Sequence, residues 1–253
     1  LLWVDDCLCL GPADAVKIAT DAMKARFDCD DIGEMLEYVG CKVDRDYAKR
    51  TVKFTQPVMV QSFRDEFDIE DALKRPPATP AEPGSVLLPA RPEDYVSSAK
   101  QTYYRSGVGK MLHMMRWSRP ETGSSTRELS RSLKGASELH IKAMHRQMAY
   151  VVSTPDRGFV LNPRRLWNGR ADALKFIIAG EADSDYAKCP ITRRSISGNV
   201  TRFEGVAIII KSIMQKLVAL SVTESELYSG VTAAQDMLYL MRLVESVGLE
   251  VEL

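Results

Sequence analysis

The sequence predicts an α+β protein in which strands near the two ends of the chain flank a helical middle. Short apolar runs around polar turns in residues 1–10 and 38–55 are typical of β-hairpins. Apolar residues that recur every three or four positions across residues 102–152 predict helices. The last third holds three strand-like runs followed by one long amphipathic pattern, which predicts a second sheet with a covering helix.

Size and composition place the chain among globular proteins. It has 253 residues, with 45% hydrophobic and 27% charged side chains, which is enough for a sizeable core. It contains no apolar run of bilayer length and no recognisable signal peptide, so we expect an intracellular protein that spans no membrane. The five cysteines are odd in number and include no CxxC pair. We therefore expect reduced, mostly buried thiols rather than disulfides or a zinc site.

Charge is distributed unevenly, although the formal net charge is zero. Residues 1–46 carry eleven acidic and five basic side chains, whereas residues 97–146 carry ten basic and three acidic ones. An acidic cluster followed by a basic stretch suits a metal centre beside a polyanion. The alternative is a set of solvated faces whose charges cancel.

The opening segment, LLWVDDCLCLG, predicts two strands with Asp5 and Asp6 at the bend between them. Adjacent carboxylates at the end of a sheet suit a hard cation such as Mg²⁺. The alternative is an ordinary polar turn, because aspartate favours turns. The apolar runs on both sides weigh against it, since they would bury the hairpin and make unpaired charges costly. A helix over residues 13–27 is expected next.

Residues 38–43 and 51–55 predict a second hairpin, and a helix is expected after Pro57. The apolar side of that helix carries Val60, Phe63 and Phe67. Residues 75–93 hold six of the chain's twelve prolines and therefore predict an extended connector. Two helical stretches follow, 102–117 and 124–152, the second interrupted near Gly135. Its later apolar positions are Ile141, Met144, Met148 and Val151.

In the last third of the chain, the spacing of apolar residues changes from a helical pattern to a strand pattern. Residues 173–187 predict a long strand, and their nearly continuous apolar start indicates burial on both faces. Residues 192–199 predict a turn into a second strand, and residues 205–212 predict a third. A long helix then begins with a capping box of Ser221 and Glu224. Its expected apolar stripe is Leu227, Val231, Ala234, Leu238 and Met241, and Gly248 is expected at C′.

Three further acidic residues in this region are candidate metal ligands. Asp183 and Asp185 point to the same face of an extended strand, an arrangement that suits a divalent cation. The alternative is a solvated strand end. Glu226 lies in the first turns of the following helix, where an acidic residue also suits the helix dipole without any catalytic role.

Six blocks of the sequence, in collinear order, resemble the Pol polyprotein of copia-type (Pseudoviridae) LTR retrotransposons in its reverse transcriptase and ribonuclease H region. WVDD with its apolar flanks is similar to the YVDD motif of reverse transcriptases. The other blocks are FDCDDIGEMLEYVGCKVDRD, KFTQPVMVQSFRDEF, YRSGVGKMLHMMRWSRPET, GEADSDYAKCPITRRSISG and VALSVTESELYS. Together they cover nearly the whole chain, which makes the resemblance far more specific than any one motif.

The resemblance implies an order of domains. Residues 1–56 would be the C-terminal part of a polymerase palm, with the VDD hairpin and a primer-grip-like hairpin. Residues 57–152 would form the thumb and connection, including the connector at 75–93. Residues 153–253 would form an incomplete ribonuclease H-like α/β domain with a mixed sheet. The implied function is that of a fragment of an RNA-directed DNA polymerase with ribonuclease H. The alternatives are a catalytically dead relic that at most binds nucleic acid and, more weakly, another ribonuclease H-like phosphotransferase such as a transposase.

The resemblance also assigns metal ligands. It identifies Asp5 and Asp6 with the acids that bind polymerase Mg²⁺. It identifies Asp183 and Glu226 with the acids that bind ribonuclease Mg²⁺, and Asp185 would be a neighbouring ligand of less defined role. Two Mg²⁺ ions per active site are implied in the intact protein, with Mn²⁺ as a substitute. Both carboxylate sets are incomplete in this sequence, so we expect the isolated chain to lack polymerase activity and to show weak or no ribonuclease activity.

Nucleic-acid contacts are expected at three places. Val39, Gly40 and Cys41 match the primer-grip region, with a plain packed hairpin as the alternative. Arg193 and Arg194 could touch substrate phosphates or form a charged turn. Arginines beside Trp117 could line a nucleic-acid surface or a solvated helix face; they are Arg116, Arg119, Arg127 and Arg131. The three histidines, His113, His140 and His145, are expected to be structural or surface residues.

The implied partners are an RNA/DNA hybrid, a primer–template, a dNTP in the intact enzyme, and the upstream palm and fingers of the same polyprotein. The implied location is a cytoplasmic virus-like particle with a nuclear stage. The blocks also depart from the family pattern. Trp3 and Tyr186 replace a Tyr and a Trp, and Ile209 and Ile210 stand where a Trp is common. These departures indicate a divergent or decaying copy.

Overall fold

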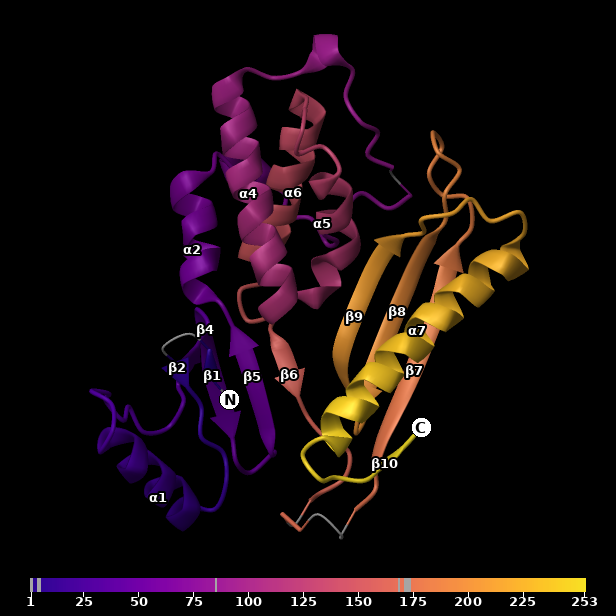
Figure 1. Ribbon diagram of the computed structural model, residues 1–253. Coiled ribbons are helices and arrows are strands. Elements are labelled where there is room, and N and C mark those ends of the chain that lie inside the picture. Colours follow the sequence, from indigo (N-terminus) through magenta and orange to yellow (C-terminus); the bar gives the residue numbers. More distant parts are fainter. Residues whose placement is uncertain (1, 4–5, 85, 168, 171–173) are drawn as a thin grey trace.

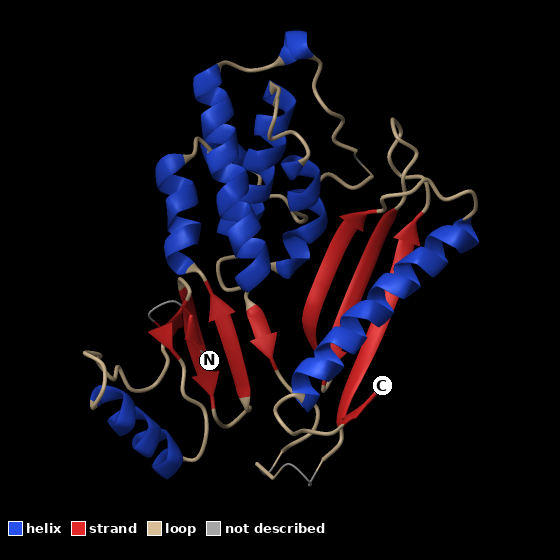
Figure 2. Cartoon of the chain, in the orientation of Figure 1, coloured by secondary structure: helices blue, strands red, loops and turns tan. Residues whose placement is uncertain are grey.

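The chain folds into two four-stranded β-sheets, a small opening hairpin and a helical bundle, as the computed structural model in Figure 1 shows. The structure describes residues 2–3, 6–84, 86–167, 169–170 and 174–253. Helices and strands largely segregate along the chain, which confirms the predicted α+β class. Figure 2 shows the bundle above the first sheet and the long C-terminal helix lying across the second. Among the residues described, no helix combines the length and the apolar character that a membrane crossing requires.

The opening elements form a hairpin and a surface helix. They are β1 (Leu2–Trp3), β2 (Asp6–Cys7) and α1 (Ala13–Lys24). Trp3 pairs with Asp6 in an antiparallel ladder, which confirms the predicted strands for the described positions; Asp5 lies outside the described residues. No residue of α1 is fully buried, and Val16 and Met23 are half-buried. The helix therefore rests on the surface of the molecule.

The first sheet is antiparallel, with the strand order β3-β4-β5-β6. Its strands are β3 (Glu37–Tyr38), β4 (Cys41–Asp46), β5 (Thr51–Thr55) and β6 (Phe159–Leu161). The pairing of β4 with β5 confirms the predicted second hairpin. β6 pairs with β5, with Phe159 opposite Phe54. This part of the chain therefore joins the first sheet, although it follows the domain boundary predicted at residue 153.

A helical bundle follows the first three strands of that sheet. Its elements are α2 (Pro57–Glu66), α3 (Glu70–Leu73), η1 (Pro92–Asp94), α4 (Ser98–Trp117), η2 (Pro120–Thr122), α5 (Gly123–Ser130) and α6 (Glu138–Ser153). A hydrophobic core cluster lies here, and the predicted positions Phe63, Met144 and Met148 are fully buried in it. Gly107 lets α4 approach α6, because a Cβ there would lie 2.5 Å from the Met144 sulfur. The connector, residues 75–93, is irregular in its described part before η1, with bends at 78–81 and a turn at 83–84, so the prediction of an extended segment holds only in part.

The second sheet has the strand order β10-β7-β8-β9 and is covered on one face by α7. Its elements are β7 (Phe176–Asp185), β8 (Ile196–Phe203), β9 (Val206–Met214), α7 (Val222–Glu245) and β10 (Val251–Glu252). β7, β8 and β9 form an antiparallel meander, and β10 pairs parallel to β7, so the sheet is mixed. The prediction that β7 is buried on both faces is wrong. Phe176 and Ile178 are buried, but Ile177 between them is 41% exposed.

The face that α7 turns to the sheet also differs from the prediction. The expected stripe is turned outward, with Leu227 67% exposed. The buried positions are instead mostly small or polar, among them Ser225, Ser229 and Ala233. Small side chains let the helix approach the sheet closely, and Gly180 contributes because a Cβ there would lie 2.4 Å from the Met237 sulfur. Close backbone approach, rather than apolar bulk, therefore selects this face.

The ends of α7 agree with the prediction in part. Ser221 caps the helix, since its hydroxyl accepts from the backbone N–H of Glu224 at 3.1 Å. The Glu224 carboxylate accepts from the N–H of Leu220 rather than that of Ser221, so the reciprocal half of the capping box is displaced by one residue. Gly248 has a φ of 79° and lies two residues after the C-cap Ser246, one position beyond the expected C′.

Candidate nucleic-acid groove and its acidic edge

Asp183 and Asp185 lie on the face of β7 that points away from α7. Side chains alternate along a strand, and Ser184 between them faces α7, where its hydroxyl accepts a hydrogen bond from Ser225 at 2.8 Å. Both aspartates are exposed. The shared face that their spacing predicts is therefore present, and it lies on the side of the sheet opposite the long helix.

A groove of about 500 Å³ runs along this face of the sheet. Asp183, Asp185 and Ser212 line it from the strands, Arg127 lines it from α5, and Arg131 lines it from the C-cap of that helix. The connector forms a further wall. Acidic side chains on the sheet thus face basic side chains on a helix that lies more than fifty residues earlier in the chain.

The basic wall is fixed to the sheet by hydrogen bonds. Arg127 Nη1 donates to Ser212 Oγ at 2.9 Å. Arg127 and Arg131 both form ion pairs with Glu128, at 2.7 and 2.9 Å. The cluster of Arg127, Arg131 and Glu128 carries one formal positive charge, and its guanidinium groups suit a phosphate. Glu82 and Glu121 also line the groove, where they pair with Arg146 and Arg119.

The floor of the groove stays open beside Asp183. Gly198 is the register partner of Asp183 on β8, and a Cβ at this glycine would meet no atom within 4 Å. Asp185 forms an ion pair with Lys188 at 2.9 Å, whereas Asp183 forms none with the described part of the chain. Asp183 is therefore the carboxylate that is accessible to a ligand in this groove.

Glu226 lies on the other side of β7. It follows Ser225 on α7, is half-buried, and does not line the groove. β10 pairs with β7 only at Phe176 and Ile177, so within the described residues the edge of β7 is open beside Asp183. Asp183 and Glu226 therefore lie on elements at opposite faces of β7, with Glu226 next to Ser225, which contacts Ser184.

The residues that the structure describes do not complete a magnesium site. No group of three or more His, Cys, Asp or Glu side chains that could hold a metal ion is found within the described ranges. Carboxylate oxygens are the ligands that Mg²⁺ prefers, and Asp183 and Asp185 supply such oxygens from one face. Their chemistry fits part of a coordination shell for Mg²⁺, but not the whole of it.

The predicted polymerase acids are less completely described. Asp6 is described by its backbone, as a residue of β2, and Asp5 lies outside the described residues. Their grouping with other carboxylates stays a prediction.

The predicted primer-grip residues form a tight turn between β3 and β4. Tyr38 pairs with Cys41, and the two loop residues, Val39 and Gly40, have φ angles of 49° and 72°, typical of a type I′ turn. A positive φ is unusual for a β-branched residue and stores strain of roughly 1–3 kcal/mol. The Tyr38 ring meets the Trp117 ring edge-on, with 6.3 Å between centroids, so the turn abuts the end of α4.

Cys41 does not belong to the predicted surface. Its side chain is 1% exposed, and burial raises the pKa of its thiol to about 11. The prediction that the Cys41 side chain contacts nucleic acid is therefore wrong, because that side chain is buried. Val39 is half-buried and Gly40 is exposed, so the tip of the turn stays accessible.

Arg119 is also a structural residue rather than a surface contact. It is 2% exposed, and its guanidinium donates to the carbonyl and the hydroxyl of Thr154 at 3.1 and 2.7 Å. It also pairs with Glu121 at 2.6 Å and lies 5.3 Å from the ring centroid of Tyr150. The prediction that Arg119 lines a nucleic-acid surface is therefore wrong, because every face of the guanidinium is occupied by the protein itself.

The other predicted arginines are accessible to different degrees. Arg116 is exposed on α4, and Arg193 and Arg194 are exposed in the loop between β7 and β8, where Arg193 has a φ of 56°. Arg127 and Arg131 are half-buried in the groove wall. Of these five arginines, Arg127 and Arg131 line the groove, and the other three do not.

Sequence reasoning did not single out Cys189, which also lines the groove. Burial of this thiol acts to raise its pKa, but hydrogen bonds from Thr192, Ile191 and Arg131 outweigh burial and lower the pKa to about 7. The Arg131 contact measures 3.4 Å from Nη2 to the sulfur. The signal that could have identified this residue is the turn that follows it, in which the backbone N–H groups of Ile191 and Thr192 donate to the thiol.

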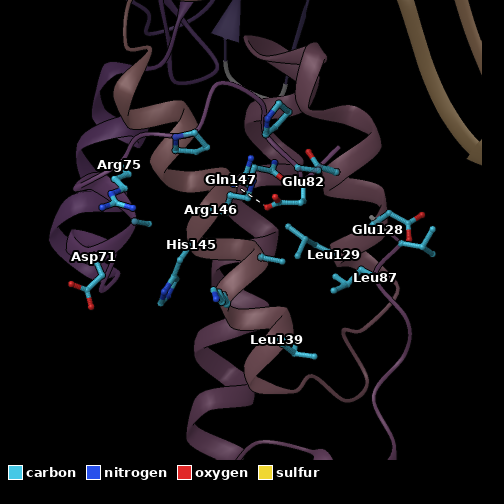
Figure 3. Close-up of a pocket in the computed structure, with 18 of the residues that line it drawn as sticks. Asp71, Arg75, Glu82, Leu87, Glu128, Leu129, Leu139, His145, Arg146 and Gln147 are labelled. Carbon is cyan, nitrogen blue, oxygen red and sulfur yellow. Dashed lines mark ion pairs between the residues drawn. The ribbon is translucent and has the colours of Figure 1, made fainter. Parts of the chain in front are cut away.

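A second cavity of about 690 Å³ lies between the connector and helices α3, α5 and α6 (Figure 3). Glu82 of the connector pairs with Arg146 of α6 at 3.2 Å and holds the connector in place. Gln147 is buried at the cavity wall, where its amide nitrogen donates to Thr126 at 2.6 Å and its oxygen has no partner in the described structure. Glu128 lines both this cavity and the groove, so α5 forms a wall between them.

The histidines have structural roles, as expected. His140 completes the N-terminal cap of α6 with Ser137, and burial lowers its pKa. His145 hydrogen-bonds Tyr103 at 2.8 Å, and burial lowers its pKa as well. His113 is hydrogen-bonded to Gln56 at 2.9 Å.

All five cysteines are free, as expected, but only two of them are buried. The buried pair is Cys41 and Cys189. The expectation that most of the thiols are buried is therefore wrong.

Comparison with curated proteins relates the chain to polyproteins of mobile elements. The chain is 28% identical, over 98% of its length, to the retrovirus-related Pol polyprotein from transposon TNT 1-94 of Nicotiana tabacum. It is 25% identical, also over 98% of its length, to the retrovirus-related Pol polyprotein from transposon RE1 of Arabidopsis thaliana. The chain spans 18% and 16% of the length of these two relatives. No protein-family model and no solved structure matches the chain.

A shorter relative matches part of the same region. It is the secreted RxLR effector protein 161 of Plasmopara viticola, 30% identical over 141 residues, which are 56% of this chain and 93% of the relative. The Pol matches span 98% of the chain, so they include nearly all of the segment that the shorter relative matches. The mixed helix-and-sheet fold is compatible with these relatives. The chain belongs to the same family as the shorter relative, and its homologues over nearly the full length are retrovirus-related Pol polyproteins of plant transposons.

Proposed function

We propose that the chain is the segment of a retrotransposon Pol polyprotein that joins the end of a reverse transcriptase palm to a ribonuclease H-like domain, and that it holds an RNA/DNA hybrid in the groove between α5 and the second sheet. Similarity to Pol polyproteins over nearly the full chain supports the proposal. The observation that carries it is the groove itself, where Asp183 faces Arg127 and Arg131 across an open floor at Gly198.

Each side of the groove would have its own task. Arg127 and Arg131 would bind a phosphate of one strand, because planar guanidinium groups match phosphate oxygens in pairs. Gly198 would leave room for the sugar-phosphate backbone beside Asp183. Asp183 would present its carboxylate to the cleavage position, and Arg193 and Arg194 would contact phosphates further along the hybrid.

Metal ions in such a site would be Mg²⁺ or Mn²⁺, which activate water and stabilise the leaving oxygen in phosphoryl transfer. The described residues do not complete that site. Asp183, Asp185 and Glu226 are therefore proposed as contributors that other parts of the polyprotein would complement. The same holds for Asp5 and Asp6 in the polymerase site, where Val39 and Gly40 would hold the primer end and the upstream palm and fingers would supply the rest.

A second candidate function is the binding of nucleic acid without catalysis, as expected of a relic element. The absence of a converging group of three metal ligands in the described residues favours this candidate for the isolated chain. Both candidate functions place the nucleic acid in the same groove, and they differ only in whether the bound hybrid is cleaved.

Binding is tested with a fluorescently labelled RNA/DNA hybrid and fluorescence anisotropy over a range of salt concentrations. Replacing Arg131 by Ala should weaken binding several-fold and lower the slope of log K against log salt by about 1, as for the loss of one phosphate contact. Lys134→Ala is the matched control, because Lys134 is exposed just beyond the same helix and does not line the groove. Equal losses in both variants would contradict the proposed groove.

Catalysis is tested by comparing the 253-residue chain with a longer Pol chain extended at both ends. We expect no Mg²⁺-dependent primer extension and little or no hybrid cleavage by the shorter chain. The longer chain should cleave the hybrid, and Asp183→Asn should abolish that cleavage while leaving hybrid binding intact. Hybrid binding without cleavage by the longer chain would favour the second candidate, and robust turnover by the shorter chain would refute the incomplete site.

A further inference from the structure

The second sheet ends in a long apolar edge strand. β9 occupies the outer position in the strand order β10-β7-β8-β9, on the side of the sheet that faces β6 (Figure 1). Within the described residues, the backbone of β9 pairs with β8 alone. Four of its nine residues are isoleucines, and none is a proline. The unpaired backbone groups on the outer side of such a strand are a ready template for another strand.

The usual protections of an edge strand are incomplete here. Native edges are commonly blunted by a projecting charge, a proline or a bulge. The only charged residue of β9, Lys211, is turned to α7, where its ammonium pairs with Asp236. A bulge interrupts the ladder at Ile208, but residues 209–214 pair regularly with β8. The stretch after the bulge is therefore a regular edge, in which Ile210 is 41% exposed.

A pocket of about 600 Å³ borders the same strand. Residues 208–213 line it from β9, and apolar side chains of α4 and β6 line it as well; they are Leu112, Met115 and Phe159. Arg127 and Ser212 line both this pocket and the groove, so the two sites meet at the hydrogen bond between these residues. Ile210 lies on the same face of β9 as Ser212, because side chains alternate along a strand. The side chains of an added strand that point to this face therefore meet an apolar surface.

The charges of the pocket select the kind of partner. The charged residues that line it are all basic; they are Arg116, Arg127 and Lys211. Lys211 and Arg127 have carboxylate partners, Asp236 and Glu128. Arg116 is exposed and forms no ion pair with the described part of the chain, so it is available to a carboxylate. A second copy of β9 cannot supply that carboxylate, because the strand holds no acidic residue.

We propose that the edge of β9 and this pocket bind an extended segment of a protein partner, rich in apolar and acidic residues, which adds to the second sheet as a further strand. Backbone hydrogen bonds along residues 209–213 supply the affinity, and the alternating side chains supply the selectivity. Apolar side chains of the partner contact Ile210 and Met115, and an acidic side chain pairs with Arg116. The site does not depend on the proposed action on nucleic acid.

The test uses the full chain and a fluorescein-labelled octapeptide of alternating valine and glutamate, with binding followed by fluorescence anisotropy. One peptide should bind per chain, and the peptide with lysine in place of glutamate should bind more weakly by about tenfold or more. Arg116→Ala should weaken binding of the glutamate peptide several-fold and reduce its dependence on salt. Arg64→Ala is the matched control, because Arg64 is exposed on α2 and does not line the pocket, and it should keep full affinity. Equal affinities of the two peptides, or equal losses in the two variants, would overturn the proposed partner.

The backbone of the probe separates strand addition from plain charge attraction. In a strand, the N–H groups of alternate residues point to opposite edges, so N-methylation of alternate residues removes every donor from one edge. Two such peptides are compared, one methylated at the valines and the other at the glutamates. One of them should lose binding, because its methyl groups face β9, and the other should keep it. Equal affinities of the two methylated peptides would overturn strand addition.

A substitution in the strand itself locates the peptide. Ile210→Asp should lower the affinity for the glutamate peptide by more than about tenfold, because it replaces an apolar contact by a like charge. Ile177→Asp is the matched control, since Ile177 of β7 is also 41% exposed and does not line the pocket, and it should bind as the unmodified chain does. Circular dichroism of both variants should match that of the unmodified chain, because both side chains are exposed. Full affinity in Ile210→Asp would overturn the site.

Other occupants of the edge would give different results. A single-stranded oligodeoxynucleotide that binds more tightly than the glutamate peptide, and loses affinity in Arg116→Ala, would replace the protein partner by nucleic acid. A dimer of the chain in sedimentation velocity that Ile210→Asp dissociates would assign the edge to a second copy. Either result would overturn the proposal, whereas a monomer that binds the glutamate peptide more tightly than the oligonucleotide supports it.

Discussion

Ser229 of α7 donates a hydrogen bond to the backbone carbonyl of Asp183 on β7, with 2.7 Å between the two oxygen atoms. Ser229 is fully buried, and one turn earlier Ser225 donates in the same way to Ser184 at 2.8 Å. The long helix therefore holds the acid-bearing end of β7 through hydroxyl groups rather than through apolar bulk. The backbone from which Asp183 and Asp185 project is fixed from the opposite face.

Replacing Ser229 by Ala should lower the free energy of unfolding by roughly 1–2 kcal/mol, because it removes a donor from a buried carbonyl. Urea denaturation followed by circular dichroism measures the change. Ser246→Ala is the control, since Ser246 is exposed at the C-cap of α7 and its hydroxyl donates to the Leu243 carbonyl of the last turn. We expect a change within about 0.5 kcal/mol for the control. A loss for Ser229→Ala no larger than the control's would show that the hydroxyl does not anchor β7.

This interface also shows what the sequence can and cannot predict about the fold. A period of 3.6 residues locates α7 correctly, but two stripes fit that period, one of large apolar residues and one of serine and alanine. Hydrophobicity alone selects the stripe of Leu227, which the structure turns outward. The serine stripe is buried because β7 presents Gly180 and Ser184 to it, and that complementarity depends on two elements together.

The candidate site likewise has one part that the local sequence predicts and another part that it does not. Alternation along a strand is a local property, and it places Asp183 and Asp185 on one face, as predicted. The opposite wall of the groove depends on contacts between distant residues. Arg127 reaches Ser212, 85 positions away, and Arg131 reaches Cys189, 58 positions away. No pattern within a window of ten or twenty residues contains such contacts, and so neither the groove nor the thiol was predicted.

The turn at Val39 offers a test of strain at a predicted contact with nucleic acid. Val39→Asn should raise the free energy of unfolding by about 1 kcal/mol, because Asn followed by Gly is favoured in type I′ turns and β-branched residues are not. Thermal or urea denaturation measures the gain. Val160→Asn is the matched control, since Val160 lies in a regular strand with no such φ, and it should destabilise the chain. A loss of stability in Val39→Asn would mean that packing of the valine outweighs its backbone strain.

Substitutions at Arg119 and Arg116 should differ in their effect on the free energy of unfolding, because Arg119 is buried and Arg116 is exposed. Arg119→Ala removes the partner of Thr154 and Glu121 from a buried site and should cost roughly 2–4 kcal/mol of unfolding free energy. Arg119→Lys should restore only part of this, because a lysine cannot reproduce the forked geometry. Arg116→Ala should change stability by less than about 0.5 kcal/mol, since Arg116 is exposed. Comparable losses in Arg116→Ala and Arg119→Ala would contradict the structural role assigned to Arg119.

Glu204 should make the second sheet sensitive to acid. It is buried at the β8–β9 turn, where Arg165 donates to its carboxylate at 2.8 Å and the backbone N–H of Ile177 donates at 2.7 Å. The Arg165 hydrogen bond is the main cause that lowers the pKa of Glu204, with the Ile177 contact adding to it against the effect of burial. In acid the unfolded chain therefore binds more protons at this residue than the folded chain does.

The stability that Glu204 contributes is fully present above the unfolded-state pKa of glutamate, about 4.3, and is lost as the pH falls through the lower folded-state value. Glu204→Gln should therefore be less stable than the unmodified chain near neutral pH, and the difference should shrink as the pH falls below about 4. Urea denaturation at a series of pH values measures both curves. Glu245→Gln, at an exposed position of α7, should follow the unmodified chain in parallel. A constant difference between Glu204→Gln and the unmodified chain at every pH would exclude titration of this carboxylate as its source.

Gly198 allows stability and groove access to be changed in opposite directions. A Cβ at this position would meet no atom within 4 Å, and β8 is a central strand between β7 and β9. Gly198→Val should therefore raise the free energy of unfolding by up to about 1 kcal/mol, because glycine weakens strand interiors and valine favours them. The same side chain would stand beside Asp183 on the floor of the groove. It should weaken binding of an RNA/DNA hybrid, measured by anisotropy, in a protein that is more stable than the original.

Gly230→Ala is the control, since Gly230 is exposed on the solvent side of α7, where alanine should stabilise the helix and leave binding unchanged. Full hybrid affinity in a stabilised Gly198→Val variant would place the nucleic acid elsewhere on the molecule, because no duplex that contacts Asp183 could avoid the added valine.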